Sequence, residues 1–170
     1  MARFKKAVIT EKGLALVTKV QMGSTTLKFT KIATGAGSYG DEDVGTRTAL
    51  KDKRQEFSLS SISVVDNDTV KLRAVISNAG LETGYYIREI GLFAQDPDEG
   101  EILYSLAVAY DGQWDYLPAE SEVSPATINL DTFSSVANAS TVTIQGGTGA
   151  YASAADLEAL RKLVEEHYKV

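Results

Sequence analysis

The chain has 170 residues, 44% of them hydrophobic, which is enough for a substantial core without disulfide bonds. Its formal net charge of −6 disfavours nucleic acid as a partner, because nucleic-acid binding needs a clustered basic surface. With no cysteine and one histidine, His167, the sequence excludes cysteine nucleophiles, thiolate metal sites and a two-histidine zinc site within one chain. No run approaches the roughly 18 apolar residues of a transmembrane helix, so we expect no membrane insertion.

The first predicted element is a helix from about Glu11 to Met22, with apolar residues at helical spacing. Thr10 is a suitable N-cap, and Glu11 suits the positive end of the helix dipole. Gly23 suits a left-handed C-terminal cap. Gly13 is expected to weaken the helix, because glycine has a low helix propensity.

From Thr25 the period changes to two, which predicts a strand that ends in a glycine-containing loop, Thr34–Asp43. This loop has no Gly-Lys-Ser/Thr motif and no following helix, so it is not a phosphate loop. Its acidic end lacks the ligand spacing of an EF-hand, so calcium is not expected. Further on, Phe57–Val65 and Thr69–Ser77 are predicted to pair as an antiparallel hairpin.

The most apolar part of the chain is a second predicted hairpin, which should lie at the centre of the core. Its strands are Tyr86–Ala94 and Glu101–Ala109, joined by a loop of about five or six residues around Asp96–Gly100. Glu89 lies inside the first apolar strand. A glutamate there must face solvent or pair with a cation, and it could equally contact another subunit.

Paired carboxylates are the only remaining candidates for catalysis, and they gather in the hairpin loop. A general acid needs a desolvated pocket that raises its pKa, and a solvated turn offers none. We therefore expect no enzyme activity and no cofactor. The acidic residues are instead candidate contacts with another subunit or partner: Glu89, Asp96, Asp98 and Glu99.

Aromatic residues follow the hairpin, and they have two interpretations. Tyr110, Trp114 and Tyr116 stand near acids and an amide, as in sugar-binding platforms. Alternatively, this loop folds its rings over the open end of the sheet. The last strands are predicted at Ala126–Ala137 and Thr141–Gln145. Seven or so short strands after one helix predict a mainly β fold, an antiparallel β-sandwich with an N-terminal helix.

Residues 1–145 are therefore predicted to form one domain, followed by a glycine-rich linker at 146–152 and an amphipathic helix at 153–170. Ser153 and Asp156 form a variant capping box. A single short helix is marginally stable in water, so it either docks on its own domain or associates with its copies, which we favour. Its apolar seam supplies the candidate oligomerisation residues Leu157, Leu160, Leu163, Val164 and Tyr168.

Four groups of residues, in order, carry a resemblance to a known family. They are Phe4–Thr10 with Gly13–Leu16, Leu27–Gly37, Glu89–Ala94 with Asp96–Tyr104, and Asp115–Pro118. Over roughly 1–144 the chain resembles the N-terminal domain of phage tail-collar fibre proteins, found in contractile-tailed phages and phage-tail-like bacteriocins. The resemblance implies a structural virion protein without catalytic residues, whose domain attaches a trimeric fibre to the baseplate.

The family pattern continues into a shaft and a receptor-binding tip, whereas this sequence stops at Val170. It is therefore expected to be either a fragment of a fibre or a short adaptor for a separate fibre. The implied partners are a baseplate protein and other fibre chains in a homotrimer, located in the virion tail after synthesis in the bacterial cytoplasm. The alternative is a carbohydrate-binding module that uses Tyr110, Trp114 and Tyr116 to bind a host receptor.

Overall fold

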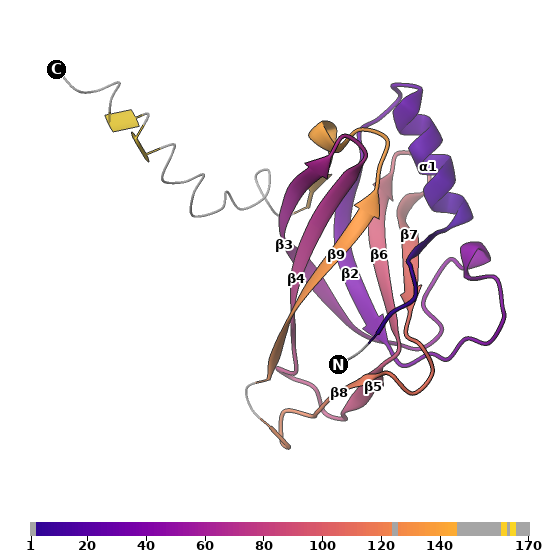
Figure 1. Ribbon diagram of the computed structural model, residues 1–170, viewed down its shortest axis with the longest axis vertical. Helices are drawn as coiled ribbons and strands as arrows, with labels where there is room; N and C mark the ends of the chain where they lie inside the picture. Colours follow the sequence, from indigo (N-terminus) through magenta and orange to yellow (C-terminus); the bar gives the residue numbers. More distant parts are fainter. Residues whose placement is uncertain (1–2, 124–125, 146–160, 163, 166–170) are drawn as a thin grey trace.

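The computed structural model describes residues 3–123, 126–145, 161–162 and 164–165. Most of the strands join one strongly curled sheet, whose neighbours run in the order β1-β7-β6-β2-β3-β4-β9 (Figure 1). The strands on this path are β1 (Val8–Ile9), β2 (Lys28–Gly35), β3 (Lys53–Asp66), β4 (Thr69–Ser77), β6 (Glu89–Asp96), β7 (Gly100–Val108) and β9 (Thr127–Ser135). An eighth strand, β10 (Thr143–Ile144), pairs with β2 in parallel.

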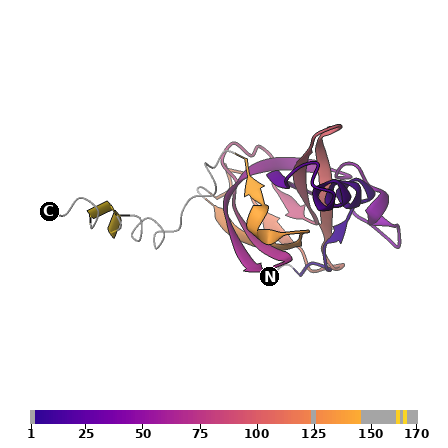
Figure 2. The same ribbon diagram turned by 90° about the horizontal axis from the view of Figure 1, so that it is seen from above.

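The mainly β class with an N-terminal helix is confirmed, but the predicted sandwich of two sheets is wrong. β3 has 14 residues, and it pairs with β2 through its first half and with β4 through its second. Register shifts interrupt both ladders, near Gly35 and between Leu59 and Ser61. Bulges bend a strand and increase its twist, so β3 carries one continuous sheet around the curl, seen from above in Figure 2. The result is a half-barrel.

The core fills the inside of this curl. Alternate residues of β4 are buried, as the sequence pattern predicts: Val70, Leu72, Ala74 and Ile76. The rings of Phe29 and Tyr104 meet edge to face, with centroids 5.1 Å apart. The predicted hairpin of β3 and β4 is also confirmed.

The helix α1 (Glu11–Gln21) packs on β7. As predicted, Thr10 caps it, and its hydroxyl accepts from the N–H of Gly13 at 3.0 Å. Gly23 has a φ of 79° and ends the helix in a left-handed turn. A Cβ on Gly13 would lie 2.3 Å from the carbonyl oxygen of Tyr104, so this glycine permits the close contact between helix and sheet.

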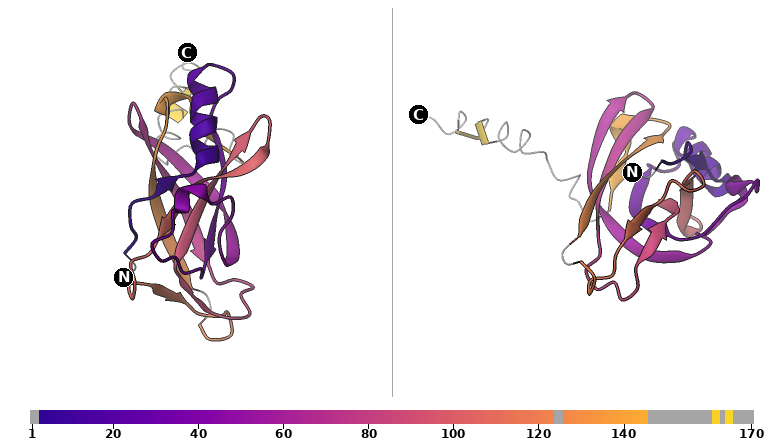
Figure 3. Two further views of the ribbon diagram at one scale, coloured as in Figure 1. Left: turned by 90° about the vertical axis from the view of Figure 1, so that its right-hand side faces the viewer. Right: turned by 60° about the horizontal axis from the view of Figure 1, so that its bottom comes forward.

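The central hairpin differs from its prediction at both ends. Its turn has three residues rather than five or six, since Asp96 pairs directly with Gly100. The predicted strand from Tyr86 is two strands, because the chain changes direction at Arg88, whose N–H binds the carbonyl of Gly35. The first piece, β5 (Tyr85–Ile87), pairs with β8 (Asp115–Leu117) as a small separate sheet at the end of the molecule away from α1 (Figure 3).

Short 3-10 helices occupy Val44–Thr46 and Ala139–Thr141. The last predicted strands correspond to β9 and β10. In the described ranges no helix is long and apolar enough to cross a membrane. The predicted linker at 146–152 lies outside the described residues, as does most of the predicted C-terminal helix at 153–170.

Candidate functional site

Glu89 is the first predicted contact residue, and its side chain is fully buried within the chain. One carboxylate oxygen accepts from the N–H groups of Gly37 at 2.7 Å and Asp52 at 2.9 Å. The other accepts from the hydroxyl of Tyr39 at 2.6 Å and the N–H of Lys51 at 2.9 Å. The expectation that Glu89 faces solvent or pairs with a cation is wrong, because neutral donors surround it.

These four donors determine what Glu89 can do chemically. A carboxylate offers about four lone-pair positions, and all of them are taken. The donors come from two stretches of the long loop between β2 and β3, so Glu89 ties both stretches to β6. Burial, followed by the nearby Glu89 carboxylate, raises the pKa of Tyr39, which stays a neutral donor. Glu89 is thus an anchor for the loop and has no free position for proton transfer.

Asp96 is the second predicted contact, and it too is buried, with 1% of its surface exposed. Its carboxylate accepts from the amino group of Lys19 at 2.8 and 3.0 Å and from the N–H of Asp98 at 2.8 Å. Burial opposes ionisation of Asp96, but Lys19 and the backbone donors outweigh burial and hold its pKa below the usual value. The bond to Asp96 in turn raises the pKa of Lys19 to about 12.

The other two acids of the turn also pair with α1. Asp98 lies 2.8 Å from the amino group of Lys19, and Glu99 lies 3.2 Å from that of Lys12. The turn between β6 and β7 is therefore clamped to the helix by ion pairs within the chain. Asp98, with 73% of its side chain exposed, is the most open of these acids to a partner.

The structure brings two of the three predicted aromatic residues, Trp114 and Tyr116, into one cluster. The residue that links them is Tyr86, which the sequence analysis does not include among the candidates. Tyr86 lies between Trp114 and Tyr116, with ring centroids 5.8 and 5.0 Å away. The Arg88 guanidinium lies 4.1 Å from the centre of the Trp114 ring. Tyr110 belongs elsewhere, since its ring contacts cations of the N-terminal segment.

Tyr86 lies within a strand that is predicted to be in the core, yet the alternation of side chains along a strand indicates that it faces solvent. Tyr85 and Ile87 are buried, so the residue between them faces outward, 46% exposed. Tyr86 and Tyr116 occupy opposed positions of the small sheet of β5 and β8. We call the cluster of Tyr86, Arg88, Trp114 and Tyr116 the aromatic patch.

The candidate oligomerisation residues are largely beyond what the structure describes. Val164 is helical and 47% exposed. Leu157, Leu160, Leu163 and Tyr168 lie outside the described residues. Within the described part of the chain, no group of three or more histidine or carboxylate side chains is placed to hold a metal ion.

Comparison with known protein families identifies a match. A family model described as the N-terminal region of phage tail-collar fibre protein matches residues 1–153. No curated protein and no solved structure matches the chain significantly. The matched family is structural and non-catalytic.

Proposed function

The chain belongs to the phage tail-collar fibre protein family, and from this premise we propose that it attaches a tail fibre to the baseplate of a contractile phage tail or related particle, or serves as an adaptor between the two. Membership makes it a structural protein of the virion tail. The observation that carries the proposal is the family match, which spans the whole described half-barrel.

In this proposal, residues 1–145 form the attachment domain and 146–152 a linker. The net charge of −6 favours a basic docking surface on the baseplate protein. Among the four predicted contact acids, Asp98 is the most open to such a surface. Its neighbours Asp96 and Glu99 hold the turn in place through Lys19 and Lys12.

Attachment is tested by adding labelled chain to particles assembled without it. The full chain should appear at the baseplate in electron micrographs, and residues 146–170 fused to the same label should not. Label found free of the tail in both cases would overturn the proposal.

We further propose that residues 153–170 hold the chain in a homotrimer through Leu157, Leu160, Leu163, Val164 and Tyr168. The support is the heptad-like spacing in the sequence. Mass measurement should find a trimer for the full chain and a weakened or dissociated one for a chain ending at Gly146. Monomers of both chains at micromolar concentration would contradict it.

A second candidate function, carbohydrate binding, is supported by the aromatic patch. Tyr86 and Tyr116 present exposed rings beside Trp114, and aromatic faces stack on the apolar faces of sugars. Trp114→Ala should abolish binding to host cells or glycans and leave particle assembly intact. Tyr110→Ala is the matched control, because Tyr110 lies outside the patch. This variant should bind cells or glycans as the unaltered chain does. Unchanged glycan binding in Trp114→Ala would exclude this candidate.

A further inference from the structure

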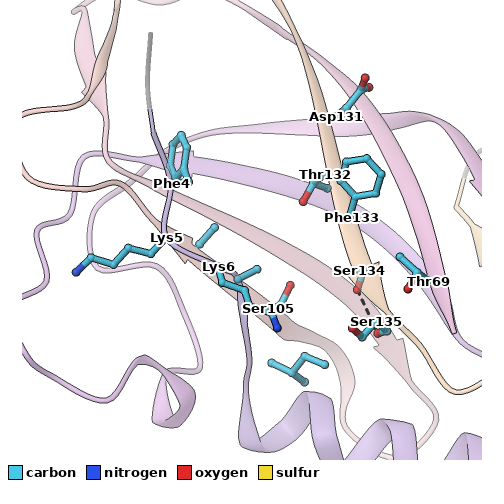
Figure 4. Close-up of a pocket in the computed structure, with 13 residues that line it drawn as sticks. Phe4, Lys5, Lys6, Thr69, Ser105, Asp131, Thr132, Phe133, Ser134 and Ser135 are labelled. Atoms are coloured by element: carbon cyan, nitrogen blue, oxygen red, sulfur yellow. Dashed lines mark hydrogen bonds between the residues drawn. The ribbon is translucent and has the colours of Figure 1, made fainter. Parts of the chain in front are cut away.

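The curled sheet does not close on itself, and its two edge strands face each other across a cleft of about 540 Å³ (Figure 4). Phe4, Lys5 and Lys6, which lead into β1, line one wall. Residues 131–135 of β9 line the opposite wall, and Ser105 and Ala107 of β7 also line the cleft.

The β9 edge carries unused backbone hydrogen-bonding groups. The N–H of Val136 binds the carbonyl of Asp68, so by antiparallel alternation the even-numbered residues of β9 bond to β4. The odd-numbered residues therefore turn their N–H and C=O groups away from β4: Thr127, Asn129, Asp131 and Phe133. Among the described residues, these groups accept and donate no hydrogen bonds on that side. Further along, the Ser135 carbonyl accepts from the Tyr104 hydroxyl at 2.9 Å.

This edge also lacks the usual protection against strand addition. Natural edge strands are blunted by charged side chains, especially lysine, by proline, by bulges or by short length. Residues Thr127–Ser135 include neither lysine nor proline, and their one charged residue, Asp131, is paired with Arg73. Their pairing with β4 runs without a register shift. Phe133 is 57% exposed. The β1 edge, in contrast, slips by one residue between the pairs Phe4–Ala109 and Val8–Leu106.

Strand direction identifies what fits between the two edges. Every pair of neighbours along the path from β1 to β9 is antiparallel. The path has seven strands, so β1 and β9 run in the same direction. One further strand would be antiparallel to both edges. A single extended segment satisfies this geometry. The edge of a second folded domain does not, because the wall formed by β1 stands opposite β9.

The charge of the cleft indicates the chemistry of that segment. Lys5 turns its amino group away from β9 and toward the Tyr110 ring, 5.9 Å from its centre (Figure 4). None of the ion pairs among the described residues involves Lys6, whereas Asp131 is already paired with Arg73 at 2.7 Å. Lys6 therefore gives the β1 wall of the cleft an uncompensated positive charge. Ser105 and Ala107 are small, and they leave room for modest apolar side chains facing inward.

We propose that β9 accepts an extended acidic segment of a partner protein, which adds as an antiparallel strand and closes the half-barrel. Main-chain hydrogen bonds to the odd-numbered residues supply affinity, and acidic side chains facing Lys6 supply selectivity. This goes beyond baseplate attachment and does not depend on it.

The test measures binding of labelled nine-residue peptides, the length of β9, by fluorescence anisotropy with the full chain. The probe alternates glutamate and valine, and its counterpart has lysine in place of glutamate. The acidic peptide should bind saturably, and its counterpart should bind about tenfold more weakly or not at all. Lys6→Glu should weaken binding of the acidic peptide by a similar factor. Lys28→Glu is the control and should leave binding unchanged, because Lys28 is exposed and lies outside the cleft.

Asn129→Pro examines the edge itself. The N–H of Asn129 points away from β4, so proline keeps the existing ladder and blocks the added strand. The variant should lose peptide binding and keep its thermal unfolding midpoint. Binding that survives Asn129→Pro, or no binding of the acidic peptide at millimolar concentration, would overturn the proposal.

Two further outcomes would assign the cleft to another occupant and overturn the proposal as well. Peptide binding by a chain ending at Gly146 but not by the full chain would identify residues 147–170 as the occupant. Self-association that Asn129→Pro abolishes would identify a second copy of the chain.

Discussion

Glu89 is a buried carboxylate held by neutral donors. Three backbone N–H groups and the Tyr39 hydroxyl replace the water that a surface glutamate would have. Hydrogen bonds to a charged group are stronger than neutral ones, and leaving such donors unsatisfied in a buried site is costly. Glu89 therefore holds the long loop between β2 and β3 against β6.

Replacing Glu89 with glutamine tests this role. The amide has nearly the same size, but its NH2 group faces N–H donors where an acceptor is needed. We expect Glu89→Gln to lower the free energy of unfolding by about 2–4 kcal/mol in urea titrations. Glu101→Gln is the control, since Glu101 is a partly exposed partner of Lys31. This replacement should lower the free energy of unfolding by less than about 1 kcal/mol. Equal losses in both variants would refute the anchoring role.

Asp96 makes stability depend on pH in a defined direction. Its pKa is lower in the folded chain than in the unfolded chain, because Lys19 and backbone N–H groups outweigh burial. A lowered folded-state pKa stabilises the fold above the unfolded value, about 3.9, and this contribution disappears as pH falls through the folded value. The free energy of unfolding should therefore drop below about pH 4, and less steeply in Asp96→Asn. Identical pH profiles would contradict this account.

At the scale of elements, Gly13 allows α1 to pack closely on the sheet, although helix propensity alone predicts that this glycine destabilises the helix. Alanine is better than glycine in a helix by about 1 kcal/mol. Here the added methyl group would lie 2.3 Å from the Tyr104 carbonyl oxygen and 2.9 Å from Ile9. The contact with β7 therefore outweighs helix propensity.

Gly13→Ala should consequently destabilise the protein by about 1–3 kcal/mol, as overpacking of a close contact does. Gly40→Ala serves as the control, because a Cβ there meets nothing within 4 Å. Chemical denaturation of the two variants compares them directly. A more stable Gly13→Ala protein would show that propensity governs this helix after all.

Local signals in the sequence identified several elements correctly. Thr10 and Gly23 delimit α1, and alternating apolar residues mark β4. The break at Arg88 was not readable, because both flanking pieces are apolar and extended. Long-range contacts make the break: the Arg88 N–H binds the Gly35 carbonyl, the Arg88 carbonyl accepts from the Ala109 N–H, and β5 pairs with β8 instead of β2 and β7. Tyr86 was consequently predicted as part of the core strand rather than of the aromatic patch.

At the scale of the whole molecule, the buried core of the described residues lies within the half-barrel and runs from Leu16 to Ile144. A chain ending at Gly146 should therefore unfold cooperatively at the same midpoint temperature as the full chain, measured by circular dichroism at matched concentration. A lower midpoint that depends on protein concentration would instead show that association through residues 147–170 stabilises the half-barrel.

The sequence by itself determined the mainly β class, the leading helix, the hairpin of β3 and β4, and the family. These depend on local periodicity, caps and short motifs, which neighbouring residues encode. Only the tertiary structure decided that the strands form one curled sheet rather than a sandwich, and that Glu89 is satisfied by a distant loop. It also left β9 as an open edge. These features arise from long-range pairing, in which β3 bridges two halves of a sheet, and period-two patterns do not specify which strands become neighbours.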